Sequence, residues 1–406
     1  QSSFNLSKQP PYGKEPKLSI PQVWQAKLGN TMRVAGIENK EVPLVQFDLV
    51  IDGGLLLENI DKVGVSNLLA RMMTQGTKNK TPQELEEAIQ LLGASINVFA
   101  GTEEISVSVN TLAKNYQATL DLVEEILLEP RWDAKEFELI KQSVISTLKQ
   151  QDGEPNSLAQ NQYNELIYGR SNIRSRNLLG TAASVNSITM DDLKDYYNKN
   201  ISPSVTRMVV VAPLDKTKIL AALNGLAAKW KTKKVEVPAW PVATATAKAK
   251  VYFFDVPDAK QSQLRIGYPA LSITDADYYP ANVMNYILGG GGFASRLTQE
   301  LREGKGYTYG IFSNFSGSHE PGPFTISSGV RSNVTYESSQ LVKDIVEKFG
   351  DTYTEADLAT TKSFLTKSNT RAFETASAKL NLLDDVTKYN WSPDYVLQRE
   401  KIVKNM

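Results

Sequence analysis

Residues that could bind a catalytic metal are scarce in this chain. Its 406 residues include no cysteine and one histidine, His319. This histidine lies in the turn-rich stretch Gly317–Gly322, and we interpret it as an exposed loop side chain rather than a lone catalytic base. Catalytic zinc normally needs three protein ligands, usually with histidines among them. The sequence therefore excludes disulfides, thiol nucleophiles and a conventional catalytic zinc site formed by this chain alone.

The stretch Gly64–Thr77 has the layout of a metal-binding helix. Residues at i, i+3 and i+4 share one helix face, so two histidines at that spacing can bind zinc while a glutamate activates a water. The stretch is similar to the active helix of the pitrilysin/insulinase-like zinc peptidases, the inverzincins, which carry H-x-x-E-H there and end in Gly-Thr. The corresponding positions in this chain hold Asn67, Ala70 and Arg71.

These three side chains do not supply the chemistry of that motif. An amide is a poor zinc ligand, a methyl group cannot act as a base, and a guanidinium repels a cation. The resemblance implies a further glutamate ligand in a later long helix, where Lys141–Gln151 contains no acidic residue. We therefore predict no metal site and no cofactor on this chain. A plain amphipathic helix packed through its apolar residues is the alternative interpretation, and it is compatible with the resemblance.

A second stretch of interest begins with four consecutive glycines: Gly289, Gly290, Gly291 and Gly292. Such a run before a helix could bind phosphate, but the Lys-Ser/Thr of a P-loop and a preceding apolar strand are both missing, which disfavours a nucleotide site. The run, the Ser-Arg-Leu after it and the L-R-x-x-K-G-x-x-Y pattern that includes Arg302 and Tyr309 resemble the second-domain signature of the same family.

The resemblance implies roles for these residues. In the family the tyrosine hydroxyl donates to the substrate carbonyl or the developing oxyanion, and the arginine holds the peptide or supports the tyrosine. By resemblance, Arg302 and Tyr309 contact substrate, and the glycine run belongs to the substrate-binding surface. Read without the resemblance, Arg302 is a surface helix charge and Tyr309 a packed strand aromatic.

The elements that must position these residues occur twice along the chain. Three pairs of similar segments keep nearly the same offset in residue number: Gln46–Ile51 and Gln263–Tyr268, Val65–Met72 and Ala281–Leu288, and Leu122–Ile126 and Leu341–Ile345. Repeats of this length are whole domains rather than solenoid units. We predict an α+β fold of two similar duplicated domains, each a mostly antiparallel sheet with helices packed on one face. By resemblance the fold is like that of the mitochondrial processing peptidase, in which such a chain forms one half of a clamshell.

The basic run Lys229–Lys234, followed by prolines and an Ala/Thr/Lys-rich stretch, is typical of an interdomain linker. It divides the chain into a peptidase-like domain over residues 1–234 and a second one over residues 235–406. The segment after Val185–Ile188 has no counterpart after Val403–Met406, so we expect the second domain to lack its last helix and strand. An exposed sheet edge is then expected there.

Composition limits the partners. Lys+Arg and Asp+Glu number 45 each, which argues against nucleic acid as a partner, and no apolar stretch is long enough to span a membrane. The absence of cysteine and the start at Gln1 favour a periplasmic or otherwise extracytoplasmic location, with the cytoplasm as the alternative.

The resemblance leads to one preferred function and two alternatives. In some family members one chain or half carries the zinc motif and the other keeps only the glycine-rich loop and the Arg/Tyr pair. We expect this chain to be such a non-catalytic partner, inactive alone, which binds unfolded peptides and supplies Arg302 and Tyr309 to a zinc-bearing subunit. The alternatives are a scaffolding pseudo-peptidase without a proteolytic role and the latter half of a longer polypeptide.

Overall fold

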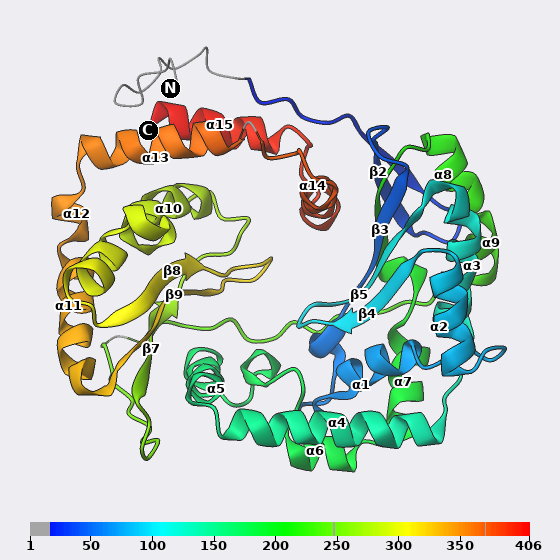
Figure 1. Ribbon diagram of the computed structural model, residues 1–406, viewed down its shortest axis with the longest axis horizontal. Helices are drawn as coiled ribbons and strands as arrows, with labels where there is room; N and C mark the ends of the chain where they lie inside the picture. The colour runs from blue at the N-terminus through cyan, green and yellow to red at the C-terminus, as the bar shows by residue number, and fades with distance from the viewer. Residues whose placement is uncertain (1–16, 247, 370) are drawn as a thin grey trace, which may run out of the picture.

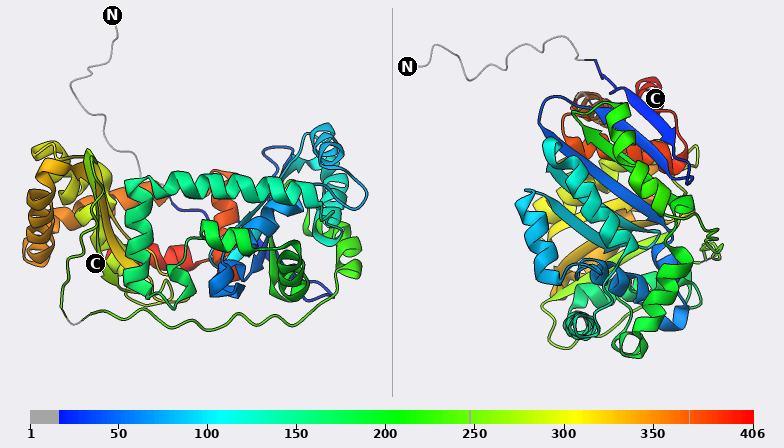
Figure 2. Two further views of the ribbon diagram at one scale, coloured as in Figure 1. Left: turned by 90° about the horizontal axis from the view of Figure 1, so that it is seen from below. Right: turned by 90° about the vertical axis from the view of Figure 1, so that its right-hand side faces the viewer.

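The computed structural model describes residues 17–246, 248–369 and 371–406, which form two α/β units joined by a long linker (Figure 1). Residues 231–246 and 248–260 contain no helix or strand, and Figure 2 shows this linker running along one side of the molecule from one unit to the other. The linker is held against the first unit, since the Trp240 indole donates to the carbonyl oxygen of Leu56 at 3.0 Å. The predicted linker region is thus extended chain.

The first unit is built on a six-stranded sheet in the order β1-β2-β6-β3-β5-β4, in which the pair β2 and β6 is parallel and every other pair is antiparallel. The strands are β1 (Val23–Lys27), β2 (Arg33–Glu38), β3 (Leu44–Asp52), β4 (Ser95–Ala100), β5 (Glu104–Leu112) and β6 (Thr206–Ala212). Alternation along β3 directs Val45, Phe47, Leu49 and Ile51 into one hydrophobic core.

Helices cover the core face of this sheet. Their apolar sides join the same core cluster, with Leu68 and Leu69 fully buried. These helices are α1 (Val65–Met73), α2 (Pro82–Leu91), α3 (Tyr116–Leu128), α4 (Ala134–Asp152), α6 (Ala182–Ser187), α7 (Met190–Asn200), α8 (Lys216–Ala222) and α9 (Asn224–Lys229). Helix α2 begins with the capping box that the sequence predicts, because Thr81 accepts from the Glu84 amide and Glu84 accepts from the Thr81 amide.

The second unit has a smaller sheet with the order β7-β9-β8, all antiparallel. Its strands are β7 (Gln261–Pro269), β8 (Thr308–Phe315) and β9 (Pro323–Arg331). Leu297, Leu301, Ile311 and Ile326 lie in its core. The remaining helices of the unit are α10 (Tyr278–Asn285), α11 (Thr335–Glu347), α12 (Phe349–Thr352), α13 (Glu355–Asn369) and α15 (Tyr395–Asn405). The predicted fold class, two α+β units with mostly antiparallel sheets, is confirmed.

The internal repeat is visible element by element. Strand β3 begins at Leu44 and β7 at Gln261, while α3 begins at Tyr116 and α11 at Thr335, so both pairs keep nearly the offset seen in the sequence. Helices α5 (Pro155–Tyr168) and α14 (Ala376–Tyr389) form a further pair, and each has 14 residues. The segments paired by sequence therefore occupy equivalent places in the two units.

The two equivalent helices α5 and α14 each pack on the sheet of the other unit (Figure 1). The Tyr163 hydroxyl of α5 lies 2.8 Å from the Thr325 hydroxyl of β9, and Arg265 of β7 donates to Gln160 of α5 at 3.2 Å. Apolar residues of α14, including Leu383, pack on β2 and β6. The sheet faces opposite the cores are therefore partly covered by helices, an arrangement that the sequence did not predict.

The second sheet has no described counterpart of β6. In the first unit β3 pairs with β5 on one side and β6 on the other, whereas β7 pairs with β9 alone among the described residues. In the linker before β7, Val251 and Phe253 are 97% and 81% exposed. The described part of the chain thus has a free β7 edge, where the sequence led us to expect one.

Candidate functional site

Helix α1, which carries the three metal-motif positions, is held at its N-terminus by a buried carboxylate. Glu58 accepts the backbone N–H groups of Gly64 and Ser66, each at 2.7 Å, and the Ser66 hydroxyl. Burial raises the pKa of Glu58 even though these hydrogen bonds oppose the shift. Because the first amides of a helix lack partners within it, this carboxylate fixes the start of α1.

Two of the three metal-motif positions form the accessible face of α1. Asn67 and Arg71 are the two side chains of this helix that are not buried, while Ala70 is 1% exposed. Arg71 Nε donates to Asn67 Oδ1 at 3.0 Å, the i to i+4 contact that the spacing allows. An amide oxygen already bonded to a guanidinium is no ligand for zinc, so the residues present do not fit the metal that such a helix holds elsewhere.

The stretch Lys141–Gln151, where the resemblance places a further ligand, lies on α4, which packs against α1. Its buried lysine has structural partners. Lys141 is buried, and its ammonium donates to the carbonyl oxygens of Ile188 at 2.8 Å and Asn186 at 3.2 Å. Within the described ranges no group of three His, Cys, Asp or Glu side chains could hold a metal ion.

The glycine run lies after α10, where the chain forms a π-helical turn, Tyr286–Gly290. Gly289 is buried, and a Cβ there would lie 2.3 Å from Ser313 Oγ of β8. A Cβ on Gly291 would meet the Tyr286 carbonyl oxygen at 2.5 Å, and Gly292 has φ +54°. Close packing therefore explains Gly289 and Gly291, while Gly290 is exposed and Gly292 half-buried. Phe293, immediately after the run, is 67% exposed.

Arg302 and Tyr309 are both accessible. Arg302 lies in the π-helical segment Thr298–Gly304, where its guanidinium carbon is 4.7 Å from the Phe293 ring centroid and its Nε is 3.4 Å from Glu303 Oε1. Tyr309 lies on β8 at an irregularity in the pairing with β9, and its side chain is 89% exposed. The fold thus brings Arg302 to the end of the glycine run. Within the described residues no hydrogen bond or cation–π contact joins Arg302 to Tyr309.

His319 lies in an exposed loop, as expected from its turn-rich surroundings. Its Nε2 is 3.1 Å from the Lys388 carbonyl oxygen, and its ring packs 4.8 Å from the Tyr389 ring between centroids. No second histidine or carboxylate contacts the ring in the described chain. The residue makes a contact between units rather than a catalytic pair.

Sequence reasoning missed a charged cluster where the units meet. Arg207 of β6 is 0% exposed and contacts three carboxylates, those of Asp52, Glu104 and Asp384. Lys388 of α14 extends the cluster by pairing with Glu103 at 3.1 Å. The alternating polar residues of β3 and β5 were visible in the sequence, but only the docking of α14 shows what they face.

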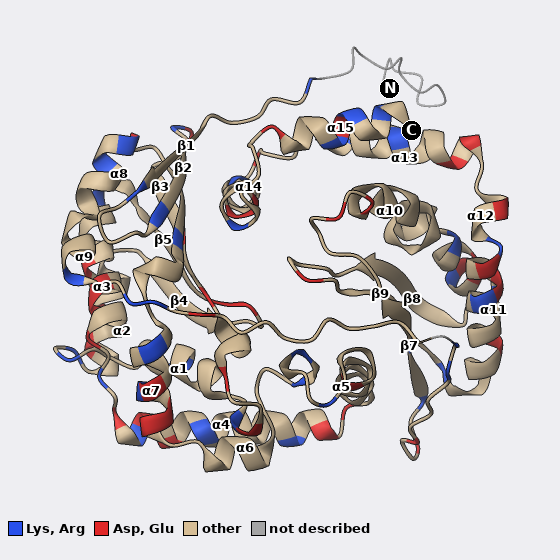
Figure 3. Ribbon diagram, turned by 180° about the vertical axis from the view of Figure 1, so that it is seen from behind, with Lys and Arg blue, Asp and Glu red and all other residues tan. Residues whose placement is uncertain are grey.

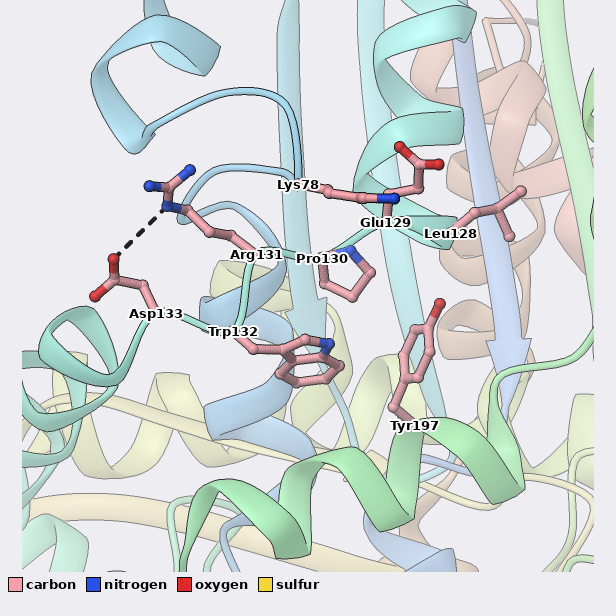
Figure 4. A pocket seen from close by; sticks show the side chains of 8 residues that line it. All are labelled: Lys78, Leu128, Glu129, Pro130, Arg131, Trp132, Asp133 and Tyr197. Atoms are coloured by element: carbon pink, nitrogen blue, oxygen red, sulfur yellow. Dashed lines mark ion pairs between the residues drawn. The ribbon is translucent and has the colours of Figure 1, made fainter.

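A surface cleft of about 690 Å³ lies apart from these residues. Figure 4 shows Trp132, Tyr197, Lys78 and the ion pair of Arg131 with Asp133 around it. The two aromatic rings pack edge to face with centroids 5.4 Å apart. None of the candidate site residues lines this cleft, so the two features are separate.

Charge and hydrophobicity add two negative findings. Lys and Arg are interspersed with Asp and Glu over the outer helices of both units in the view of Figure 3. In the residues that the structure describes, every helix is too short or too polar to cross a membrane.

The fold and the site together define a peptidase-like chain whose metal-motif positions carry an amide, a methyl group and a guanidinium. Two family models match it: Insulinase (Peptidase family M16) over residues 33–181 and Peptidase M16 inactive domain over residues 187–365. The chain belongs to peptidase family M16, which confirms the resemblance seen in the sequence.

Relatives and solved structures agree with this assignment. The chain is 26% identical to the Non-peptidase homolog YmxG of Helicobacter pylori, covering 87% of this chain and 80% of that protein. It is 23% identical to the Uncharacterized zinc protease YmxG of Bacillus subtilis, with 87% and 85% covered. A crystal structure of a peptidase M16 inactive domain from Pseudomonas fluorescens superimposes with a TM-score of 0.87 at 23% identity, covering 95% of this chain and 92% of that one.

Proposed function

We propose that this chain is the non-catalytic subunit, or half, of an M16 zinc metallopeptidase. It binds unfolded peptides and supplies Arg302 and Tyr309 to a zinc site carried by its partner. One observation carries the proposal: the accessible face of α1 presents Asn67 bonded to Arg71 in place of metal ligands, while Tyr309 remains 89% exposed. A chain of this kind needs a second chain for hydrolysis and can still contribute groups that contact substrate.

Each proposed group has a distinct role. The partner's zinc, when bound, supplies the activated water. The Tyr309 hydroxyl, which forms no hydrogen bond to another described residue, donates to the substrate carbonyl as negative charge develops on its oxygen. Arg302 lies beside the glycine run and holds the peptide backbone through its guanidinium.

Peptide binding is assigned to the free edge of β4. This strand ends the first sheet and contacts α1, so an added strand would run close to that helix. Strand addition uses backbone hydrogen bonds and tolerates many sequences, which suits unfolded substrates. Phe99 of β4, 52% exposed, offers an apolar contact for a substrate side chain.

The test mixes this chain with an M16 protein of the same organism that keeps an intact H-x-x-E-H motif, and follows a quenched fluorescent peptide. Neither chain alone should cleave at the rate of the mixture. Tyr309→Phe should lower kcat of the mixture by about a hundredfold, as does loss of one oxyanion donor. Tyr336→Phe is the matched control, because Tyr336 is also an exposed tyrosine, at 71%.

Scaffolding is the second candidate function. It is favoured by the contacts that Arg302 already makes with Phe293 and Glu303, which a structural role would explain. Unchanged turnover in Arg302→Ala and Tyr309→Phe mixtures would select the scaffold. We also propose a periplasmic location, which cell fractionation tests. The zinc-bearing half could lie on the same polypeptide, and the mass of the native protein tests this.

A further inference from the structure

We propose that Arg71 binds a carboxylate of the peptide that lies along β4. The site that would hold a metal in a catalytic relative thus becomes an anion site in this chain. The inference deepens the proposed function and rests on it, since it needs a peptide at the β4 edge. Its ligand class is a peptide carboxylate, either the free C-terminus or an Asp or Glu side chain.

The guanidinium of Arg71 is oriented by one hydrogen bond, and its remaining N–H groups are available to a ligand. Its Nε is used by Asn67 Oδ1 at 3.0 Å, and its two Nη atoms form no hydrogen bond or ion pair with any residue in the described ranges. Two other arginines, by contrast, are neutralised: Arg207 by three carboxylates and Arg174 by Glu103 at 2.9 Å. The Nη pair of an oriented arginine matches the two oxygens of a carboxylate.

No carboxylate of the described chain competes for this guanidinium. Glu58, which lies before α1 in the chain, is committed to the backbone amides of Gly64 and Ser66. On the adjacent helix α4, the stretch from Lys141 to Gln151 has no acidic residue. Of the two lysines in that stretch, Lys141 is buried, and its ammonium is held by backbone carbonyls. The surroundings therefore leave a positive charge unbalanced on the accessible face of α1.

The position of this face decides which ligand can reach it. Seven residues of α1 are buried, so contact with α1 from outside is made at Asn67 and Arg71. Helix α1 contacts β4, whose free edge ends the sheet, and Figure 1 shows the helix beside this strand. A chain added to β4 passes this helix, and a carboxylate on it meets a half-buried guanidinium, where ion pairing is stronger than in open solvent.

The experiment measures binding of short labelled peptides of serine, threonine and valine by fluorescence anisotropy, using the full chain. Three probes share one sequence: a free C-terminal acid, its C-terminal amide, and an amide with one internal glutamate. Arg71→Gln removes the positive charge, and Arg71→Lys keeps the charge but loses the paired Nη donors of the guanidinium. Arg170→Gln is the control, because the Arg170 side chain is 82% exposed. Thermal unfolding checks that each variant is folded.

We expect the unsubstituted chain to bind the free acid about tenfold more tightly than the amide, as one charge-assisted hydrogen-bonded pair provides. Arg71→Gln should abolish this preference, Arg71→Lys should keep part of it, and Arg170→Gln should keep all of it. If the amide with an internal glutamate binds more tightly than the plain amide, the site takes side-chain carboxylates. If only the free acid binds more tightly than the plain amide, the site takes the C-terminus.

Two results would overturn the inference while leaving the proposed function intact: equal binding of all three probes to the unsubstituted chain, or a preference for a carboxylate probe that survives Arg71→Gln. If no probe binds at all, the proposed peptide-binding function fails together with this inference. The two failures are therefore distinguishable in the same titrations.

Discussion

Arg207 Nε of β6 lies 2.8 Å from Asp384 Oδ1 of α14, although the two residues are 177 positions apart in the chain. The contact joins the sheet of the first unit to a helix of the second. Because Arg207 is fully buried, its charge depends on Asp384, Asp52 and Glu104 for compensation. The docking of α14 on the first sheet thus combines apolar packing with one buried arginine that has three carboxylate partners.

Removing one of these carboxylates should weaken the docking of α14. Asp384→Ala is expected to lower the free energy of unfolding by about 2 kcal/mol, the usual value of a hydrogen bond to a charged group. Urea unfolding measures this change, and limited proteolysis should show earlier cleavage within α14. Asp351→Ala, at an exposed aspartate of α12, is the control. An unchanged unfolding midpoint for Asp384→Ala would contradict this role.

Glu58 should be needed to hold the start of α1. Glu58→Ala leaves the buried amides of Gly64 and Ser66 without their acceptor, at an expected cost of about 3 kcal/mol. Hydrogen exchange should then be faster at those two amides than at the rest of the core. Glu86→Ala, at an exposed position of α2, should change stability by less than about 0.5 kcal/mol. Equal effects of the two substitutions would argue against the capping role.

Asp48 should make stability depend on pH in a defined direction. Burial raises the pKa of Asp48, although the Ser108 hydroxyl donates to its carboxylate and opposes the shift. Because the pKa of Asp48 is higher in the folded than in the unfolded chain, its protonated carboxyl contributes to folding stability. This contribution is complete below the unfolded pKa of 3.8 and is lost as pH rises through the folded pKa. Asp48→Asn should therefore gain stability relative to the unsubstituted chain as pH rises from acid to neutral. Urea unfolding of both proteins at acid and at neutral pH measures this difference. An equal difference in unfolding free energy between the two proteins at both pH values would refute it.

Gly289 should tolerate no side chain. A Cβ there meets Ser313 Oγ at 2.3 Å and Ser313 Cβ at 2.9 Å, so Gly289→Ala should cost about 1–3 kcal/mol through overpacking. Gly350→Ala is the matched control, because nothing lies within 4 Å of its added Cβ and its φ is ordinary. That control should stabilise by about 0.5 kcal/mol. Thermal unfolding of both variants separates the two effects, and similar shifts would argue against the close packing.

The purified chain should contain far less than one zinc per molecule. The amide of Asn67 and the guanidinium of Arg71 provide no suitable ligand set, and a bound cation would be repelled. Elemental analysis after dialysis against trace zinc measures this directly. Stoichiometric zinc, lost in Asn67→Ala, would contradict the interpretation of this face.

The local elements could be predicted from sequence because their signals are local. Thr81 and Glu84 form the predicted capping box, and Thr189 caps α7 in the same way with Asp192. The alternation in β3 gave its buried face. The metal-motif face could be predicted as well, since helical spacing alone places Asn67 and Arg71 one turn apart. The Nε–Oδ1 hydrogen bond between them could not, because it depends on rotamers.

By itself, then, the sequence determined the family, the duplicated organisation and the replacement of all three metal-motif residues, because these follow from residue types and their spacing. Only the tertiary structure decided that α5 and α14 cross between the units, that Arg207 is buried among three carboxylates, and that Tyr309 remains exposed. Such relationships join residues far apart in the chain, and no local periodicity records which distant surface an element will meet.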